Sequence, residues 1–489
     1  MNGFTYDLIV IGSGPGGQKA AIQGAKLGKR TALIEKGNVL GGVCTNIGTI
    51  PSKTLREAVL HLSGYREKSI YGSAHHTKDA PTIADLLFRA NHVIRHENDV
   101  IRHQLQRNGV ELIDANAALI EPNIVAASMK AGHGQRILST DKIVIATGTK
   151  AAKDSSVPFD GQTVFTSDDI LGLKCIPKSL AVIGAGVIGC EYASIFATLG
   201  VRVTLIDKRD RLLPFIDREI SDSLAYQLRQ QRVAIRYCEE VEKFDVVENH
   251  GAKQVIIKLT SGKTVVASAA LYSVGRIGNT EELNLDSVGL TTDDRGRIKV
   301  NANYQTEVPN IYAVGDVIGF PSLASTSMEQ GRIAACNAFS HPYVSVPELF
   351  PYGIFTIPEI SMVGRTEEDL TKAGVPYEIG RATYREIARG QIIGDQIGLL
   401  KLLIHVETHK LLGVHILGED ASELIHIGQA VMAHEGTVEY FINSVFNYPT
   451  LAECYKTAAF DGINRLQNYQ PSLAGQPVKA KSPEAAVLL

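Results

Sequence analysis

The chain has 489 residues, of which 44% are hydrophobic and 21% are charged, a composition typical of globular proteins. This length predicts about three domains at ~100–200 residues each, and the absence of any uncharged apolar stretch of ~18 residues predicts no membrane span. The formal net charge of −3 excludes a broadly basic surface, so nucleic acid is not an expected partner.

The N-terminal region has the pattern of a dinucleotide site. A short apolar run, YDLIVI at residues 6–11, predicts a buried parallel strand, and a helical stretch and a second strand at residues 31–34 follow it. The G-x-G-x-x-G turn after the first strand contains Gly12, Gly14 and Gly17. In such a turn the three glycines permit the tight bend, the approach of a pyrophosphate and close packing of the helix. Glu35 ends the second strand, where an acidic residue accepts hydrogen bonds from a ribose.

The segment LGGVCTNIGTIPSK at residues 40–53 follows this turn. In this context it resembles the redox-active segment of the pyridine nucleotide–disulfide oxidoreductase family, in which two cysteines five positions apart form a disulfide against the flavin. Here Cys44 holds the first position, but Thr49 holds the second and cannot form a disulfide or carry thiolate charge. The resemblance implies FAD at the first site. It also implies that Lys53 lies near the reactive edge of the flavin, where its charge would stabilise the reduced form.

Residues 54–105 have helical spacing and predict a long helical pair, and residues 141–148 (DKIVIATG) predict another buried strand that ends in a glycine turn.

The strand–turn–helix–strand pattern then repeats. Residues 179–183 and 201–206 predict strands on either side of a second G-x-G-x-x-G turn. Its glycines are Gly184, Gly186 and Gly189. Two complete patterns predict two dinucleotides, which FAD at the first and a nicotinamide nucleotide at the second would explain.

The acidic residue of the second site favours NAD, but its neighbours favour NADP. Asp207 ends the second strand and can accept hydrogen bonds from an unphosphorylated ribose. Lys208, Arg209 and Arg211 follow at once, and such cations can neutralise a 2′-phosphate. The sequence therefore predicts a site that accepts both nucleotides, although a solvated turn would give the same run of charges.

The family resemblance extends through the rest of the chain. Glu191 matches the glutamate that pairs with the flavin-side lysine, so we predict an ion pair with Lys53 beside the isoalloxazine. The segment TEVPNIYAVGD at residues 306–316 resembles the second FAD signature of the family, in which Asp316 would bind the ribityl chain. The expected cofactor-binding residues are Gly12, Gly14, Gly17, Glu35, Lys36, Thr45, Lys53, Gly148, Gly184, Gly186, Gly189, Asp207, Lys208, Arg209, Gly275, Gly315 and Asp316.

Residues 347–468 resemble the dimerisation domain of the family, which implies a homodimer or a larger homo-oligomer. In the disulfide reductases this domain supplies a His-Pro-Thr segment whose histidine exchanges protons with the thiols. Here Tyr448 holds the histidine position, and tyrosine, with an ordinary pKa of ~10, is a poor proton shuttle at neutral pH. Glu453 remains, but it has no imidazole to orient.

Loss of a cysteine and of this histidine removes the thiol half-reaction and leaves the flavin half-reaction. The pattern is similar to family members that move hydride between NADPH and NAD⁺ through the flavin, and one shared nucleotide site would give ping-pong kinetics. The expected catalytic residues are Lys53 and Glu191, with Cys44 packing on the flavin without redox activity. Two alternatives stay open: an NAD(P)H oxidase or diaphorase, and a non-catalytic flavin redox sensor.

The cysteines predict the compartment. The six cysteines are scattered without a C-x-x-C spacing, so neither a disulfide framework nor a zinc site is expected. His75 and His76 lack further ligands, so no metal is expected. An N-terminus without a charged leader adds to the prediction of a cytoplasmic protein.

The predicted fold is α/β, with two Rossmann-like domains and a C-terminal α+β domain: 1–152 and 274–346 for FAD, 153–273 for NAD(P), 347–468 for dimerisation and 469–489 as a disordered tail.

Overall fold

The computed structural model describes residues 3–65, 70, 81–130, 134–249, 251–343 and 349–469. The chain divides into two compact units, the first formed by Met1–Phe215 and Ser221–Ile357, the second by Ile216–Ile220 and Pro358–Leu489. His75, His76 and residues 470–489 of the predicted tail lie outside the described residues. The division into three domains and a tail, drawn from the sequence, stays a prediction.

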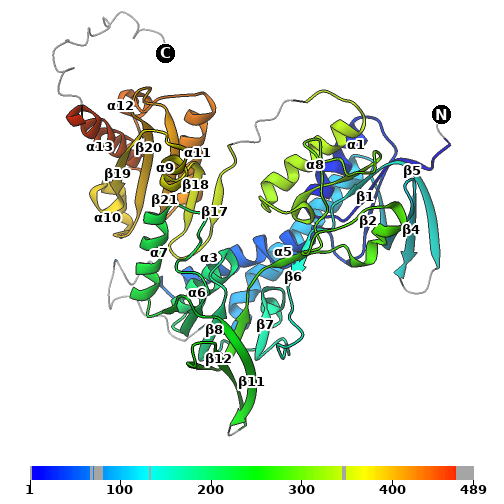
Figure 1. Cartoon of the computed structure of the whole chain (residues 1–489), viewed down its shortest axis with the longest axis horizontal. Coiled ribbons are helices and arrows are strands. Elements are labelled where there is room, and N and C mark those ends of the chain that lie inside the picture. The colour runs from blue at the N-terminus through cyan, green and yellow to red at the C-terminus, as the bar shows by residue number, and fades with distance from the viewer. Residues whose placement is uncertain are drawn as a thin grey trace, which may run out of the picture. The chain divides into compact units, whose positions relative to one another are not determined.

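The first unit contains a sheet that begins at the N-terminus. Its strands follow the order β1-β2-β3-β4-β5-β16, and β1 also pairs with β5. The parallel pairs are β1 with β2, β1 with β5, β2 with β3 and β5 with β16, whereas β3, β4 and β5 form an antiparallel meander. The strands are β1 (Tyr6–Ile11), β2 (Thr31–Glu35), β3 (Glu111–Glu121), β4 (Ile124–Met129), β5 (Gln135–Ile145) and β16 (Ile311–Ala313). Figure 1 shows α1 (Pro15–Lys26) beside α8 (Ala324–Ala338), near this sheet.

Strand β1 is apolar from Leu8 to Ile11 because both of its faces are covered there. Leu8 and Val10 join the core formed with α1 and α8, whereas Ile9 and Ile11 join the core formed with the meander. Alternate side chains point to opposite faces of a strand, and a parallel strand that is covered on both sides therefore needs a continuous hydrophobic run. This burial fixes β1, and with it the glycine turn at its carboxyl end.

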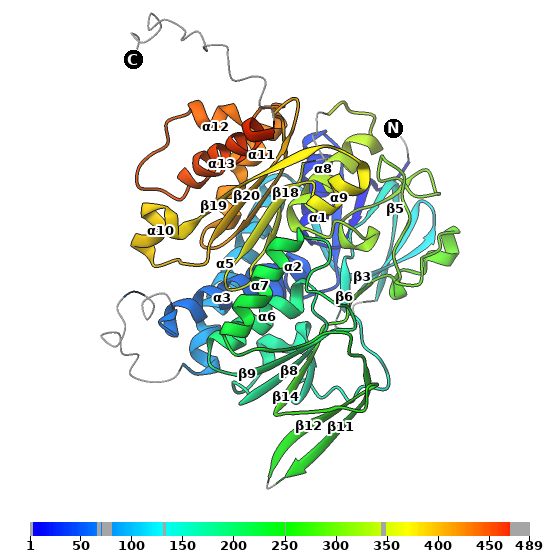
Figure 2. The same cartoon turned by 60° about the vertical axis from the view of Figure 1, so that its left-hand side comes forward.

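A second parallel sheet in the same unit repeats this arrangement. Its order is β10-β9-β8-β14-β7, and every neighbouring pair is parallel. The helix α6 (Val187–Thr198) follows β8, as α1 follows β1. The strands are β7 (Val164–Thr166), β8 (Ser179–Ile183), β9 (Arg202–Ile206), β10 (Ala234–Arg236) and β14 (Ala269–Tyr272). Figure 2 shows β8, β9 and β14 together, with the hairpin of β11 (Val241–Asn249) and β12 (Ala252–Leu259) extending beyond them.

Two further pairings complete the described sheets of the first unit. Strand β13 (Thr264–Ala267) pairs with β12, and the short strands β6 (Thr149–Ala151) and β15 (Arg276–Gly278) pair antiparallel with each other. The first unit also includes β17 (Tyr352–Ile354).

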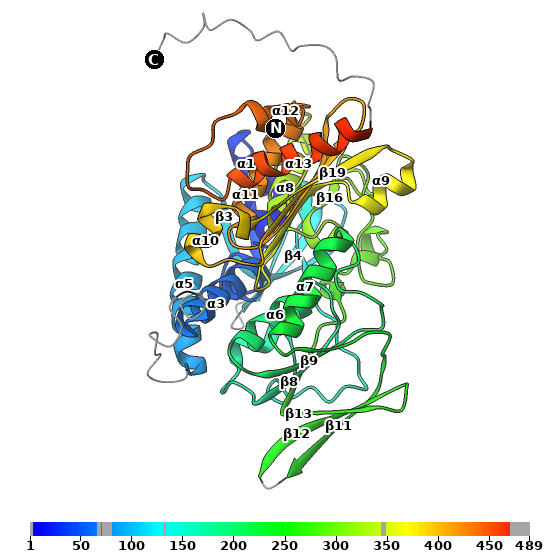
Figure 3. The ribbon, with the colours of Figure 1, turned by 90° about the vertical axis from the view of Figure 1, so that its left-hand side faces the viewer.

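The second unit has an antiparallel sheet with helices packed on it. In this sheet β18 (Ile360–Gly364) pairs with β21 (Leu411–Leu417), which pairs with β20 (Leu399–His405), and β20 pairs with β19 (Tyr377–Thr383). Helix α13 (Glu453–Tyr469) packs on β20 and on β19, beside which Figure 3 shows it, and α11 (Ala421–Ala433) packs on β21 and β18. The remaining helices are α9 (Glu367–Ala373), α10 (Ala388–Ile393) and α12 (Glu439–Asn443). The predicted fold class, two Rossmann-like parts and an α+β part, is confirmed.

Candidate nucleotide sites

The first glycine of each G-x-G-x-x-G turn holds the same strained position. Gly12 has a φ of +101° and Gly184 a φ of +98°, in the left-handed region that side chains disfavour. A Cβ at Gly12 would lie 2.5 Å from the carbonyl oxygen of Ala146, and a Cβ at Gly184 would lie 2.5 Å from that of Ser273. Each turn therefore packs tightly against the end of a neighbouring parallel strand. The two turns share this backbone geometry, as they share the glycine pattern in the sequence.

The third glycine of each turn allows the following helix to approach. A Cβ at Gly17 would overlap the carbonyl oxygen of Gly12, and a Cβ at Gly189 would overlap that of Gly184. Helices α1 and α6 begin immediately after the middle glycines of the two turns, and neither helix has a side-chain cap. Uncapped N–H groups at a helix N-terminus, together with its dipole, suit the binding of phosphate groups.

The acidic residue of the first site is held in place and keeps an open acceptor position. Glu35 Oε2 accepts hydrogen bonds from the N–H (2.8 Å) and hydroxyl (2.6 Å) of Ser13, and its Oε1 accepts one from the N–H of Gly37 (2.7 Å). A carboxylate has about four acceptor positions, so Oε1 retains one for a ribose hydroxyl. Ser13 was not predicted as a site residue, although a hydroxyl residue inside the first turn was a visible signal.

The segment that resembles the redox-active region forms α2 (Gly42–Asn46) and α3 (Thr49–Leu62). Cys44 is a free, half-buried thiol. Burial raises the pKa of Cys44, while a hydrogen bond with Thr49 opposes this rise only partly. The thiol therefore stays protonated at neutral pH, and a neutral thiol is a poor nucleophile.

The predicted ion pair between Lys53 and Glu191 is confirmed. Lys53 Nζ lies 2.9 Å and 2.8 Å from the two carboxylate oxygens of Glu191. The Glu191 side chain is 5% exposed, and the Lys53 side chain is 25% exposed. The Phe355 N–H donates to Glu191 Oε1 (2.9 Å), and the Phe355 ring centroid lies 4.9 Å from Lys53 Nζ. Phe355 thus contacts both partners, a role that nothing in the sequence indicated; the place of the pair beside a flavin stays a prediction.

The segment that resembles the second FAD signature carries a half-buried carboxylate, Asp316. Burial raises the pKa of Asp316, and Thr149 Oγ1 donates to its Oδ2 (3.4 Å). Arg276 donates through Nε to Thr149 Oγ1 (2.9 Å) and through Nη1 to Asp168 Oδ1 (2.9 Å). The backbone N–H of Gly315 donates to a glutamine side chain on α8 (2.8 Å). Thr149 and Arg276 were not predicted as site residues, because their shared contacts join positions 127 residues apart.

The acidic residue of the second site is covered by its own neighbour. Asp207 Oδ1 accepts hydrogen bonds from the backbone N–H and from Nε of Arg209, both at 2.8 Å. Oδ2 accepts from the N–H of Ala185 (2.5 Å) and from Arg209 Nη2 (2.7 Å). Burial opposes ionisation of Asp207, but the Arg209 contacts outweigh it and lower the pKa of the carboxyl. The Asp207 side chain is 5% exposed, and that of Arg209 is 40% exposed.

The other predicted site residues are placed as follows. Lys36 forms an exposed ion pair with Glu282 (3.3 Å), and Thr45 is buried. A Cβ at Gly148 or Gly275 would point into open space, although both positions have a positive φ. Lys208 is exposed, and the guanidinium of Arg211 donates to the carbonyl oxygen of Pro214 (2.5 Å).

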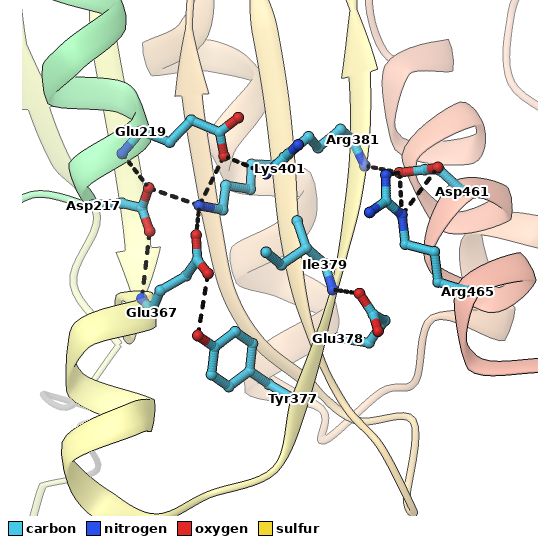
Figure 4. A network of polar contacts seen from close by, with 10 residues as sticks. All are labelled: Asp217, Glu219, Glu367, Tyr377, Glu378, Ile379, Arg381, Lys401, Asp461 and Arg465. Carbon is cyan, nitrogen blue, oxygen red and sulfur yellow. Dashed lines mark hydrogen bonds and ion pairs between the residues drawn. The ribbon is translucent and has the colours of Figure 1, made fainter. Parts of the chain in front are cut away.

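Within the described part of the second unit, three carboxylates gather at Asp217, Glu219 and Glu367, close enough to hold a metal ion. Lys401 Nζ lies 2.8 Å from Asp217 and 3.0 Å from Glu219, and it also contacts Glu367 (Figure 4). The ammonium group therefore supplies the positive charge that a metal would bring to these carboxylates. Lys401 and Asp217 have fully buried side chains.

Residues 6–331 match the family described as pyridine nucleotide-disulphide oxidoreductase, and residues 350–459 match its dimerisation domain. The chain belongs to this family of oxidoreductases. It is 53% identical over 462 residues to a soluble pyridine nucleotide transhydrogenase of Mycobacterium tuberculosis, covering 94% of this chain and 98% of the relative. A soluble pyridine nucleotide transhydrogenase of Serratia proteamaculans is 48% identical over 467 residues, covering 95% and 99%.

Solved structures of other proteins have the same architecture. The HOCl-induced flavoprotein disulfide reductase RclA from Escherichia coli matches with a TM-score of 0.82 at 29% identity, over 93% of this chain and 99% of its own. LpdA from Mycobacterium tuberculosis matches with a TM-score of 0.84 at 26% identity, again over 93% and 99%. Among the described helices of this chain, none combines the length and the apolarity that crossing a membrane requires.

Proposed function

We propose that the protein is an FAD-dependent NAD(P)⁺ transhydrogenase that transfers hydride between NADPH and NAD⁺. The observation that carries this proposal is a flavin-reductase frame with two dinucleotide turns and no dithiol, because Thr49 stands beside Cys44 where a second cysteine would be. Electrons that reach the flavin therefore have no thiol acceptor in this segment. The names of the full-length relatives support the same conclusion.

The residues of the first site fit FAD. The hydroxyl of Thr147 is buried and has no hydrogen-bond partner among the described residues. Its Cα would lie 3.2 Å from a Cβ at Gly12, so this orphaned hydroxyl lies at the turn where a bound ligand can satisfy it. The open acceptor of Glu35 suits the adenosine ribose, and the half-buried carboxyl of Asp316 suits the ribityl hydroxyls.

Bound FAD supplies the hydride chemistry, by accepting a hydride from one nucleotide and returning it to another. Lys53 holds a positive charge at the flavin edge and favours the state in which negative charge develops there. Glu191 and Phe355 hold that ammonium group in place. Because Tyr448 stands where the acid/base histidine would be, no imidazole at that position serves a thiol. Both nicotinamide nucleotides bind in turn at the second glycine turn, which gives ping-pong kinetics.

The dimerisation domain supports assembly of the chain as a homodimer, with residues 347–468 as the interface region. Residues 1–152 and 274–346 form the FAD domain and residues 153–273 the nucleotide domain. The scattered, unpaired cysteines suit a reducing cytoplasm.

An anaerobic assay tests the function. NADPH is the donor, thio-NAD⁺ is the acceptor, and the shifted absorbance of the reduced thio-nucleotide is followed. We expect fast turnover and no reduction of lipoamide or glutathione. Bleaching of the flavin by NADPH without reduction of thio-NAD⁺ would contradict the proposal. In that case oxygen uptake or quinone reduction would identify an oxidase or diaphorase, and absence of any turnover would leave a redox sensor.

A further inference from the structure

The two acidic residues that should receive a ribose differ in one respect. Glu35 keeps an acceptor position open, whereas the four contacts to Asp207 use about all the positions that a carboxylate has. Two of those four contacts come from the guanidinium group of Arg209 and two from backbone N–H groups. The nicotinamide nucleotide site is thus closed to a ribose by a side chain of the protein itself.

Withdrawal of the guanidinium group would open the carboxylate in a specific way. Nε occupies one position on Oδ1, and Nη2 occupies one position on Oδ2. When Arg209 leaves, each oxygen regains one acceptor position, which matches the two neighbouring hydroxyls of an unphosphorylated ribose. The N–H groups of Ala185 and Arg209 stay bound, so the carboxylate of Asp207 keeps its orientation.

The guanidinium group is also ready for a phosphate while it rests on Asp207. It uses the edge formed by Nε and Nη2, and Nη1 has no hydrogen-bond partner among the described residues. The edge formed by Nη1 and Nη2 therefore remains for a bidentate contact with a phosphate, and the Arg209 side chain is 40% exposed. In this position Arg209 also offsets the charge of Asp207, which would otherwise repel a 2′-phosphate.

We propose that Arg209 determines the nucleotide specificity of the second site: it stays on Asp207 and binds the 2′-phosphate of NADP(H), and it withdraws to let Asp207 bind the ribose diol of NAD(H). This inference rests on the proposed function and gives one site two modes of recognition. The neighbouring Arg211 is less suited to this exchange, since its guanidinium is bound to the carbonyl oxygen of Pro214.

Binding of two nucleotide fragments to the FAD-loaded enzyme, measured by titration calorimetry, tests the inference. The probes are adenosine 2′,5′-bisphosphate, which has the 2′-phosphate, and 5′-AMP, which has the free diol. In Arg209→Gln we expect the bisphosphate to bind about tenfold more weakly or worse, the loss expected for a hydrogen bond to a charged group. Binding of 5′-AMP should stay unchanged or become tighter, because the competing guanidinium is gone.

Three further variants complete the experiment. Arg209→Lys keeps the charge but loses the planar guanidinium group, which can bond a carboxylate along one edge and a phosphate along another. The bisphosphate should therefore bind with intermediate affinity. Arg202→Gln removes the same charge from the exposed opposite end of β9 and should change neither affinity by more than about twofold. Asp207→Asn should weaken binding of 5′-AMP and spare the bisphosphate.

Equal weakening of both probes in Arg209→Gln would overturn the inference, because a merely structural role predicts it. Unchanged binding of the bisphosphate would also overturn it and would assign the phosphate to another cation. These binding results do not depend on turnover. A transhydrogenase assay that fails while the two probes separate as expected would therefore refute only the proposed function.

Discussion

Replacement of Lys401 by methionine should destabilise the second unit strongly. Methionine has nearly the length of the lysine stem, so the change removes the charge more than the packing. Both Lys401 and Asp217 have fully buried side chains, whereas Glu219 and Glu367 are 29% and 28% exposed. Glu219 also keeps Arg381, at 3.1 Å. Asp217 is therefore the carboxylate that is left buried without a cation.

Removing one partner of a buried ion pair typically costs about 3–5 kcal/mol, far more than the pair contributes when it is intact. We expect the free energy of unfolding at pH 7 to fall by about this amount in Lys401→Met. The chain contains no tryptophan, so urea unfolding is best followed by far-UV circular dichroism, with flavin absorbance as a separate report on the first unit. Lys410→Met, which breaks an exposed ion pair with Glu435 on the same unit, is the matched control and should shift the unfolding midpoint little.

The double variant Asp217→Asn/Lys401→Met decides the cause of the loss. If the stranded carboxylate carries the cost, the asparagine should restore much of the stability, and the double-mutant cycle should show strong coupling. A loss below about 1 kcal/mol in Lys401→Met, or a double variant less stable than the single one, would refute this reasoning.

Three further predictions concern other parts of the chain. Burial lowers the pKa of His415 below the ~6.5 of an unfolded chain, so its contribution to stability is present above that pH and is lost as the pH falls toward the folded value. In His415→Gln the melting temperature should therefore depend less on pH between about pH 7.5 and about pH 5.5. An unchanged slope of melting temperature against pH would contradict this. In Gly189→Ala the added Cβ overlaps the carbonyl oxygen of Gly184, so we expect a loss of about 1–3 kcal/mol in stability. The KM for NADPH should rise while the flavin content stays normal. An unchanged KM would count against nucleotide binding at the second site. Lys53→Met removes the cation next to Glu191 and should lower the flavin midpoint potential by about 30 mV or more. Spectroelectrochemical titration measures this potential. An unchanged potential would place this lysine away from the flavin.

Local sequence patterns predicted the two glycine turns because each depends on neighbouring residues. The runs at residues 6–11 and 179–183 form β1 and β8 with the expected bounds, and the glycines at their ends hold strained positions. The ion pair between Lys53 and Glu191 joins residues 138 apart, and it was predicted from the family resemblance. Neither periodicity nor spacing carries information about such a contact.

What could not be predicted depends on the direction of side chains and on distant backbone. Phe355 reaches the ion pair through a backbone N–H and a ring face, which no residue pattern encodes. The charge run after β9 predicted cations near Asp207, but not that Arg209 would turn back on the carboxylate while Arg211 turned to a carbonyl oxygen. The assignment of residues 216–220 to the second unit is equally invisible in the sequence, because their partners follow about 150–180 residues later.

The place of residues 216–220 in the second unit affects how the chain folds during synthesis. Asp217 leaves the ribosome 184 residues before Lys401, the ammonium group that compensates its charge. At ~5–20 residues per second, the ribosome needs roughly 10–40 s to supply that partner. During this interval a finished nucleotide-binding region would still present Asp217 to water, and burial of this carboxylate has to wait for the C-terminal strands. A fragment that begins at residue 358 would meet the converse problem, since its lysine would retain only Glu367 of the three carboxylates.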